Sequence, residues 1–353
     1  KSQVYSANLT GRIGAANLTS ITGYAIDTFS GDVDAEVLLA APASALTDER
    51  VTRKLTQEIR LTGPLGAHVE WLLGAFYTDE DSEAQQAIVA VDPATGARGA
   101  ASLQIPFPSS YEEIAGFADL TFMFSDRFDV QIGGRGSHIR QVSNQQNRTP
   151  TSVTVAPEER TSATAFTYLL TPRFRVSPDL MVYARFASGY RPGGININVA
   201  VAGLPEYEPD ETQSYEFGVK GNAFDRALTF DASVYYIDWK DIQLLVRPGR
   251  FSFFTNTSRA KSQGVELSME LRPLEGLTIS GWAAWNDAVL TADFPATSTV
   301  RGRDGDRLPV SSRFSGSLSL DQEFPLSNSV TGFGGATVSY VSDWLGNFIA
   351  GPR

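Results

Sequence analysis

The sequence contains no cysteine, which excludes disulfide frameworks, thiol nucleophiles and thiolate metal sites together. Histidine is almost as scarce, since His68 and His138 are the only two. They fall on different expected strands, so the sequence offers no paired-histidine metal site. Both are expected to be structural or solvent-exposed, and we predict neither a bound metal nor a cofactor.

Long apolar runs are also absent. No window approaches the roughly 18 consecutive uncharged apolar residues that a membrane-spanning helix needs, although 42% of the 353 residues are hydrophobic. If this protein meets lipid, it must do so through strands. The opening segment, Lys1-Ser2-Gln3-Val4-Tyr5, is polar and alternating. Any signal peptide is therefore expected upstream of it.

Positive charge is not in excess either, because the formal net charge is −11. Binding to a phosphate backbone calls for clustered Lys and Arg. The sequence therefore predicts that nucleic acid is not a partner.

Strand-forming residues are abundant. The chain has 21 Phe and 12 Tyr, and no segment keeps the apolar spacing of a helix for long. An almost all-β fold is predicted. Gly, Pro and Asp supply the backbone angles of tight turns. Such residues occur near Gly14 and at 63–66, 125–127, 177–179, 223–226, 273–276 and 325–328.

Longer polar stretches with Pro and Gly separate these turns. They lie at 32–50, 84–109, 143–159, 191–210, 248–251 and 291–308. Short and long connections thus alternate, with about 50 residues from one tight turn to the next. This interval fits two strands, one turn and one loop. Counting hairpins gives about fourteen strands from Val4 to Val341, joined up and down in sequence order.

Apolar and polar residues alternate within the expected strands. Tyr215, Phe217 and Val219, for example, are separated by Glu216 and Gly218. A period of two gives one apolar and one polar face. A soluble sandwich would turn the apolar face inward, whereas a membrane barrel turns it toward lipid around a hydrated lumen. Expected strand lengths of about 12 to 20 residues exceed those of soluble sheets and favour a transmembrane barrel.

Aromatic residues support the barrel, because Trp and Tyr concentrate where hydrocarbon meets headgroups. Ordinary sheet packing is the alternative explanation for each of them. The candidates, mostly near strand ends, are Trp71, Phe124, Phe128, Phe174, Tyr183, Phe224, Tyr236, Trp285, Phe324, Phe333 and Trp344.

Charged residues occur on the polar strand faces. In a sandwich they would form wetted surface, but in a barrel they point into the lumen, where they can contact a plug or line a substrate path. This set comprises Arg60, Arg135, Arg173, Arg185, Glu216, Lys220, Glu266 and Glu270.

Two short motifs resemble a catalytic site and a calcium-binding loop, but neither pattern is complete. Residues 258–261 match the S-x-x-K spacing of penicillin-recognising enzymes, but the partner motifs are absent and the segment enters a strand. Asp304-Gly305-Asp306 does not meet the register of a calcium loop. The acidic clusters at 79–83 and 206–211 are expected to be solvated loop rims, with divalent-ion binding as the alternative. We predict that the protein is not an enzyme.

Several segments resemble the barrels of TonB-dependent receptors. Residues 186–196, FASGYRPGGIN, are similar to the strand end and extracellular loop start of that family. Residues 207–220, YEPDETQSYEFGVK, resemble a segment of the family in which Pro, Glu and Thr precede a strand that contains SYE, a Gly and a Lys. The order continues with 235–243, 256–267 and 305–309, while 18–24 and 57–61 fit the earlier strands. The resemblance spans nearly the whole chain.

The resemblance implies that residues 1–353 are one partial barrel domain in the cell outer membrane, an all-β, antiparallel, up-and-down transmembrane β-barrel with about fourteen strands of a 22-stranded whole. Short turns would be periplasmic and long loops extracellular. The family's plug and its TonB-contacting box are not visible in this sequence and would belong to a missing N-terminal region.

The resemblance also implies a transport function. The intact protein would take up a scarce, bulky nutrient such as siderophore-iron, cobalamin, or a glycan or aromatic, energised by the TonB complex. Implied partners are outer-membrane lipid and lipopolysaccharide, TonB, and a small-molecule ligand such as a metal chelate. Ligand contacts are expected from the lumen or the extracellular loops, at Tyr190, Arg191, Asn196, Arg185, Glu216 and Glu266.

Three alternatives stay open at this point. A passive porin-like channel would share the barrel without a plug. A soluble kelch-like propeller has a similar repeat length but needs four short strands per repeat. An outer-membrane enzyme would need a catalytic arrangement that this sequence does not offer.

Overall fold

The computed structural model describes residues 1–34, 43–196, 204–246, 253–298, 300–346 and 348. These residues contain nineteen strands and no helix. Within these ranges, no helical segment has the length and apolar character needed to cross a membrane.

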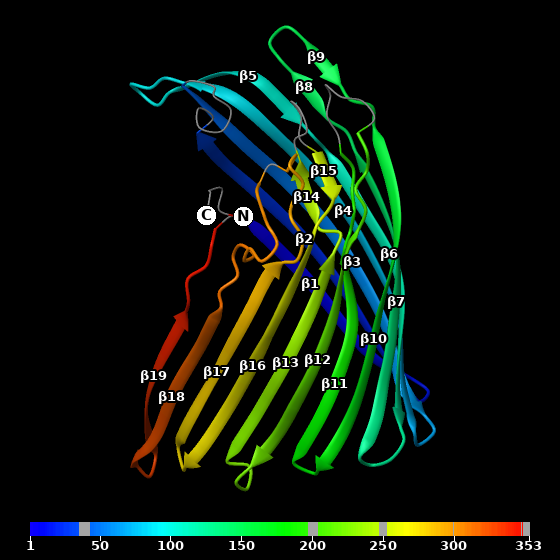
Figure 1. Ribbon diagram of the computed structural model, residues 1–353, viewed down its shortest axis with the longest axis vertical. Coiled ribbons are helices and arrows are strands. Elements are labelled where there is room, and N and C mark those ends of the chain that lie inside the picture. The colour runs from blue at the N-terminus through cyan, green and yellow to red at the C-terminus, as the bar shows by residue number, and fades with distance from the viewer. Residues whose placement is uncertain (35–42, 197–203, 247–252, 299, 347, 349–353) are drawn as a thin grey trace.

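Fourteen long strands form a single antiparallel meander that curves into a tall wall (Figure 1). Each pairs with the next one along, so the predicted up-and-down order is confirmed. The first and last strands form no ladder with each other in the described residues, which leaves the sheet open. The fourteen are β1 (Ser2–Ile13), β2 (Ala16–Asp34), β3 (Ser44–Leu65), β4 (Val69–Val91), β6 (Ser109–Met123), β7 (Phe128–Ser143), β10 (Glu159–Ser177), β11 (Leu180–Arg191), β12 (Asp210–Ala223), β13 (Leu228–Lys240), β16 (Arg259–Leu274), β17 (Leu277–Leu290), β18 (Phe314–Ser327) and β19 (Val330–Val341).

The tight turns lie along the lower edge of the wall and the long connections along its upper edge (Figure 1). The turn positions predicted from sequence are confirmed. At Gly66 and Gly276 the backbone takes positive φ angles of 69° and 77°, a conformation in which glycine avoids the steric penalty of a Cβ. Residues 224–226 achieve the same reversal without glycine, with φ of 54° to 68°.

Five short strands belong to the long connections: β5 (Arg98–Pro106), β8 (Gln146–Arg148), β9 (Val153–Val155), β14 (Gln243–Val246) and β15 (Phe253–Asn256). The predicted loops 32–50 and 84–109 are therefore partly wrong. The β2–β3 ladder continues to Asp34↔Ala45, and β5 pairs with the upper part of β4. Ladder hydrogen bonds remain available above the bilayer, so the hairpins extend as strands. Residues 248–251 lie outside the described part of the chain.

The apolar face of the wall is uncovered. Phe217, Leu267 and Leu318 are 55%, 42% and 53% exposed, and no second layer of described residues packs on them. Glu216 lies on the opposite face, where it accepts a 2.5 Å hydrogen bond from the Tyr183 hydroxyl. In water such a surface would be unstable, whereas in a bilayer it is the face that contacts hydrocarbon.

A band of rings crosses the upper part of this outer face. Ring centroids of neighbouring residues are 5.2 Å apart for Tyr168 and Phe186, 4.9 Å for Phe186 and Tyr215, and 6.3 Å for Tyr215 and Tyr236. The band continues at Trp285, Phe314 and Tyr340, of which the last two lie 6.0 Å apart. We call these seven residues the aromatic band. It marks the hydrocarbon boundary on the loop side.

Five of the predicted boundary aromatics do not lie on this face of a strand. Phe333 faces inward on β19, because Ala336 and Val338 take the outward positions. Phe124 and Phe224 lie in the turns after β6 and β12. Tyr183 lies on the inner face, because Val182 and Ala184 take the outward positions of β11. Trp344 follows the end of β19 and belongs to no strand.

Candidate ligand-binding site

The inner face of the wall carries the charged residues predicted to line a lumen. By the register of the ladders, these side chains alternate with the exposed apolar ones and so share the opposite face. They are Arg60, Arg135, Arg173, Arg185, Glu216, Lys220, Glu266 and Glu270.

A cluster of charged and phenolic groups occupies the loop-side part of this face. The Arg135 guanidinium donates to Glu113 at 2.8 Å, and the Tyr111 hydroxyl donates to the same carboxylate at 3.0 Å. Tyr190 reaches it at 3.5 Å. We call Tyr111, Glu113, Arg135 and Tyr190 the upper cluster. Glu113 is only 9% exposed, so its charge depends on these partners.

Two phenylalanine rings fix the guanidinium of this cluster. The Arg135 guanidinium carbon lies 4.8 Å from the ring centroid of Phe76 and 5.8 Å from that of Phe117. Arginine over an aromatic face gains cation–π attraction and loses little hydration. The planar group is therefore held by rings and by a carboxylate together, which gives the upper cluster a defined geometry.

Tyr190 reaches the upper cluster because β11 leaves the wall at its upper end. β11 pairs with β10 only as far as Leu169↔Ala187, but it stays paired with β12 up to Arg191↔Asp210. Released from β10, the end of β11 bends inward. The side chain of Tyr190 can then reach past β10 and β7 to Glu113 of β6.

The chain that follows β11 continues along the inner face. Gln141 of β7 donates to the carbonyl of Gly193 at 2.7 Å, and Thr161 of β10 donates to Glu206. The Gly193-Gly194 pair is required by this path. A Cβ on Gly193 would overlap the Tyr207 carbonyl, and one on Gly194 would overlap the Tyr207 hydroxyl. The two glycines let Tyr207 pack directly on the backbone.

Carboxamide side chains join this segment to the β14–β15 hairpin. Asn196 donates to the carbonyls of Pro205 (2.8 Å) and Phe254 (2.7 Å), and it accepts from the Phe254 amide at 2.7 Å. Asn256 bonds in the same two-way manner to the backbone of Glu208, at 2.7 Å each. An asparagine amide can replace a strand's backbone in this way. We call residues 192–196, 204–209, 241–246 and 253–258 the loop cap.

Charge and rings complete the loop cap. Arg191 forms an ion pair with Asp210, whose side chain is 3% exposed, and lies 5.8 Å from the ring centroid of Trp239. The Tyr207 and Phe254 rings lie 5.4 Å apart. Burial raises the pKa of the Tyr207 hydroxyl, although nearby Arg191 opposes the rise. The phenol is therefore neutral at physiological pH.

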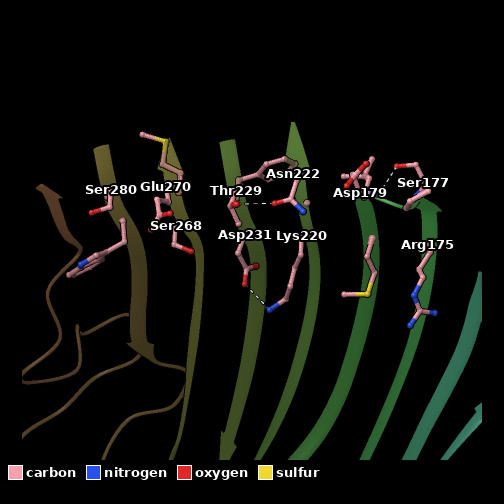
Figure 2. Close-up of a pocket in the computed structure, with 18 of the residues that line it drawn as sticks. Arg175, Ser177, Asp179, Lys220, Asn222, Thr229, Asp231, Ser268, Glu270 and Ser280 are labelled. Carbon is pink, nitrogen blue, oxygen red and sulfur yellow. Dashed lines mark hydrogen bonds and ion pairs between the residues drawn. The ribbon is translucent and has the colours of Figure 1, made fainter. Parts of the chain in front are cut away.

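Further ion pairs line the inner face nearer the tight turns. Asp129, 1% exposed, accepts from Arg173 at 2.5 Å and from Arg175 at 2.9 Å. Lys220 pairs with Asp231 at 2.7 Å. Beside these lies an open cavity of about 680 Å³ (Figure 2). Its lining comes from seven neighbouring strands, β10 to β13 and β16 to β18, and its polar residues include Arg175, Lys220, Asp231, Ser268, Glu270 and Ser280.

The six residues predicted to contact ligand are spread over this surface. Tyr190 belongs to the upper cluster, and Asn196 lies in the loop cap with Arg191 at its base. Arg185 and Glu216 face each other in register between β11 and β12. Glu266 lies on β16, two strands from Glu216. Their contact with a ligand stays a prediction.

Sequence reasoning missed Tyr111 and Glu113 as members of the site. The signal was present, because residues 113, 115 and 117 share the face opposite Ile114, Ala118 and Leu120. Within the described residues, no group of three or more His, Asp or Glu is placed to hold a metal ion.

A meander of long strands with an uncovered apolar face, a charged inner face and two kinds of connection defines an outer-membrane β-barrel wall. The chain matches the family model described as TonB dependent receptor-like, beta-barrel over residues 2–351. It belongs to that family and to the outer membrane.

The curated relatives are named as receptors. The pesticin receptor of Yersinia pestis is 29% identical over 214 residues, which are 60% of this chain and 30% of the receptor. The metal-pseudopaline receptor CntO of Pseudomonas aeruginosa is 26% identical over 228 residues, 64% of this chain and 30% of the receptor. The matches thus span less than a third of these curated relatives.

Solved structures share the fold. The ferric yersiniabactin uptake receptor FyuA from Yersinia pestis superposes with a TM-score of 0.77 at 19% identity, covering 96% of this chain and 49% of that one. The siderophore receptor PiuA from Acinetobacter baumannii gives 0.75 at 14% identity, covering 98% and 56%. At these identities the likeness concerns the fold.

Proposed function

We propose that the intact protein takes up a metal chelate of the siderophore class across the outer membrane, energised by TonB. The observation that carries this proposal is membership of the TonB-dependent receptor barrel family over residues 2–351. The names of similar proteins, among them the ferric yersiniabactin and metal-pseudopaline receptors, support the ligand class.

The inner face is suited to such a ligand. Chelates of metal ions carry carboxylates, phenolates or similar oxygen donors, which guanidinium and phenol groups recognise. Arg185 is exposed on the inner face and has no ion pair in the described residues. The upper cluster and the loop cap lie above it, on the side from which ligand arrives. In this proposal Arg185 attracts the chelate, and Tyr190 and Arg191 orient it.

The other partners are proposed with the function. TonB would act on the intact receptor from the periplasmic side, and lipid with lipopolysaccharide would contact the outer face. The passive-porin alternative finds no support in the family membership. The named relatives are transport receptors, which fits the expectation that the substrate is not chemically changed.

Uptake of radiolabelled iron tests the proposal. The intact gene is expressed in a strain that lacks its own chelate receptors, and a panel of ferric chelates is supplied with and without a functional TonB complex. We expect saturable uptake of at least one chelate that disappears without TonB. Uptake that is unsaturable and indifferent to TonB would instead establish a passive channel.

Variants on the inner face locate the ligand. Arg185→Ala should raise the concentration for half-maximal uptake roughly tenfold, the value of one charge-assisted hydrogen bond. Ala184→Leu, at the adjacent outward position, serves as the matched control and should leave uptake unchanged.

A further inference from the structure

A tryptophan on the inner face of β17 has no partner in the described part of the chain. Trp282 lies in register between Ser268 of β16 and Ser317 of β18, which places it on the inner face. It is 48% exposed and forms no hydrogen bond, ring contact or ion pair with a described residue. Its indole ring is therefore free to stack on a flat group that enters the lumen.

Tyrosines on neighbouring strands of this face are engaged by the protein itself. Tyr183 of β11 donates to Glu216 at 2.5 Å, and Tyr235 of β13 donates to Asn286 at 3.2 Å. These bonds fix the orientation of both phenols. Trp282 differs, because its strand holds it in place while its ring stays open to the lumen and available to a ligand.

Small side chains surround Trp282 on the inner face. In the register row on its loop side, four strands contribute small residues and β16 contributes Glu266. The four are Gly218, Ser233, Ala284 and Ser315. We call Trp282 and the hydroxyl residues around it the hydroxyl track, which comprises Ser268, Ser280, Ser317, Ser319, Thr337 and Ser339. Part of the track lies in the open cavity of about 680 Å³, into which Ser268 and Ser280 project from neighbouring strands (Figure 2).

The hydroxyls of the track form few contacts, and these are exchangeable. Ser317 pairs with Ser339 across β18 and β19. Ser319 and Thr337 pair in the same way. The Ser268 side chain forms no hydrogen bond with a described residue. A hydroxyl both donates and accepts, so an oxygen of a ligand can take the place of such a partner or of water.

The track lies below the cation that is proposed to attract the chelate. Through the ladder pairs of β11, β12, β13, β16 and β17, Arg185 is level with Asn286 of β17. Trp282 is four residues nearer the tight turns on the same strand, a distance of roughly 13 Å at about 3.3 Å per residue. In height, the ring and the hydroxyls thus lie between the capture point and the periplasmic turns.

The inner face of β6 to β10 is poorly suited to passage, because its groups are bound to one another. Asp129 is 1% exposed and accepts from Arg173 and Arg175. On β6, both oxygens of Asp119 accept from Gln131 of β7, at 3.0 and 2.9 Å. A ligand moving over this face would have to separate buried ion pairs, which is unfavourable because it leaves a charge without a partner.

The charges beside the track indicate the kind of ligand that it suits. Lys220 pairs with Asp231 at 2.7 Å. Arg272 pairs with Glu270, also at 2.7 Å. Glu266, in the row above, has no ion pair with a described residue. These cations are already neutralised, so the track favours a chelate whose donor charges are balanced by its metal over a strongly anionic one.

We propose that a chelate imported by the intact receptor moves along the hydroxyl track of β16 to β19, and that Trp282 stacks on a planar ring of the ligand during this passage. The inference rests on the proposed function. It adds the strands that carry the ligand and the class of ligand, a ring-bearing chelate of low net charge. Many weak contacts suit passage, because each must be favourable enough to admit the ligand and weak enough to release it.

Thiol labelling in cells tests the route. Since residues 1–353 contain no cysteine, Ser317→Cys places a single thiol on this wall. The probe is a small hydrophilic methanethiosulfonate, supplied outside cells that express the intact receptor together with the ferric chelate it imports, with and without a functional TonB complex. Labelling of Ser317→Cys should rise roughly tenfold with TonB as the route opens. The control, Thr121→Cys on the inner face of β6, should be labelled at the same rate in both strains.

The pattern of labelling decides the route. A rise at Ser317→Cys alone supports it. Equal rises at both positions, a rise at Thr121→Cys alone, or no rise at either position overturns it. A parent receptor that imports no chelate would refute the proposed function instead, so the two failures are distinguishable.

Transport kinetics test the ring. Trp282→Ala should lower the maximal rate of uptake roughly fivefold, the value of one stacking contact. The concentration for half-maximal uptake should stay unchanged, since capture occurs at Arg185. Trp282→Phe keeps a ring and should restore most of the rate. The matched control, Trp285→Ala, removes the outward tryptophan of the same strand and should leave the rate unchanged.

Three results would overturn the role of Trp282: an unchanged rate in Trp282→Ala, an equal loss in Trp282→Phe, or a loss that appears as a raised half-maximal concentration. The shift of the barrel on unboiled gels verifies that each variant folds. If Trp282→Ala misfolds, Ser317→Leu replaces it, because it narrows the track beside the ring and should also lower the maximal rate. An unchanged rate in that variant then overturns the proposal.

Discussion

The inner faces of β6 to β11 and of the β18–β19 pair are built from different side chains. The first carries buried charges that the protein pairs itself, as in Glu113 with Arg135 and Asp129 with two arginines. The second carries exposed hydroxyls in a ladder, with Ser317 and Ser339 at 3.0 Å and Ser319 and Thr337 at 2.9 Å.

This difference indicates that the two regions of the wall have different roles. Buried charges are costly unless paired, so their partners fix a unique arrangement of β6 to β11 and of the loop cap above it. Hydroxyls cost little to hydrate and can change partners freely. The hydroxyl-lined face is therefore suited to contacts that form and break, whereas the charged face is suited to holding a site in shape.

The largest effect is expected at Asp129. Asp129→Asn leaves Arg173 and Arg175 without their carboxylate and should destabilise the intact barrel by about 3 kcal/mol. Asp231→Asn is the matched control. It breaks an ion pair in which both side chains are at least 40% exposed, so its cost should stay below about 1 kcal/mol. Denaturant unfolding measures both. Equal costs would remove the distinction between buried and exposed charge on this wall.

A somewhat smaller effect is expected from Gly193→Ala. The added Cβ meets the backbone of Tyr207 and Glu208, which cannot rotate away, so the loop cap should shift at a cost of about 2 kcal/mol. Limited proteolysis of the cap reports the shift. Gly116→Ala is the control, since its Cβ would meet nothing within 4 Å. A cap equally resistant in both variants would show that the close approach is not required.

Asn196→Ala tests the carboxamide link. It removes three hydrogen bonds and leaves the Phe254 amide unpaired, at a local cost of about 1 to 2 kcal/mol. Hydrogen exchange at Phe254 should accelerate roughly tenfold, while the midpoint of global unfolding stays unchanged. Asn222→Ala, which loses one hydrogen bond to Thr229, should leave that exchange as it is. A lowered global midpoint would instead make the cap part of the barrel's cooperative unit.

The smallest effect is expected in the hydroxyl ladder. Ser317→Ala should change the free energy of unfolding by no more than about 0.5 kcal/mol, because water replaces the lost partner of Ser339. The same denaturant measurement checks it. A cost close to that of Asp129→Asn would show that both halves of the wall are fixed by their inner contacts.

Some of the site could be predicted from the sequence and some could not. Alternation placed Arg135, Glu216 and Lys220 on the inner face, because a strand turns each side chain by a fixed half rotation. The preference of aromatic residues for the hydrocarbon boundary placed Tyr183 wrongly, since the alternation of β11 puts it on the inner face. Alternation could not join Tyr190 to Glu113, because 77 residues separate them and the contact depends on where β11 leaves β10.

The sequence by itself determined the strands, their order, the turns and the outward direction of the apolar residues. These features are local: each follows from a period of two or from the angles available to Gly, Pro and Asp. Only the tertiary structure decided how the loop cap folds against the wall and which charges are paired. Those features depend on register and curvature across several strands, which bring together residues that no local pattern connects.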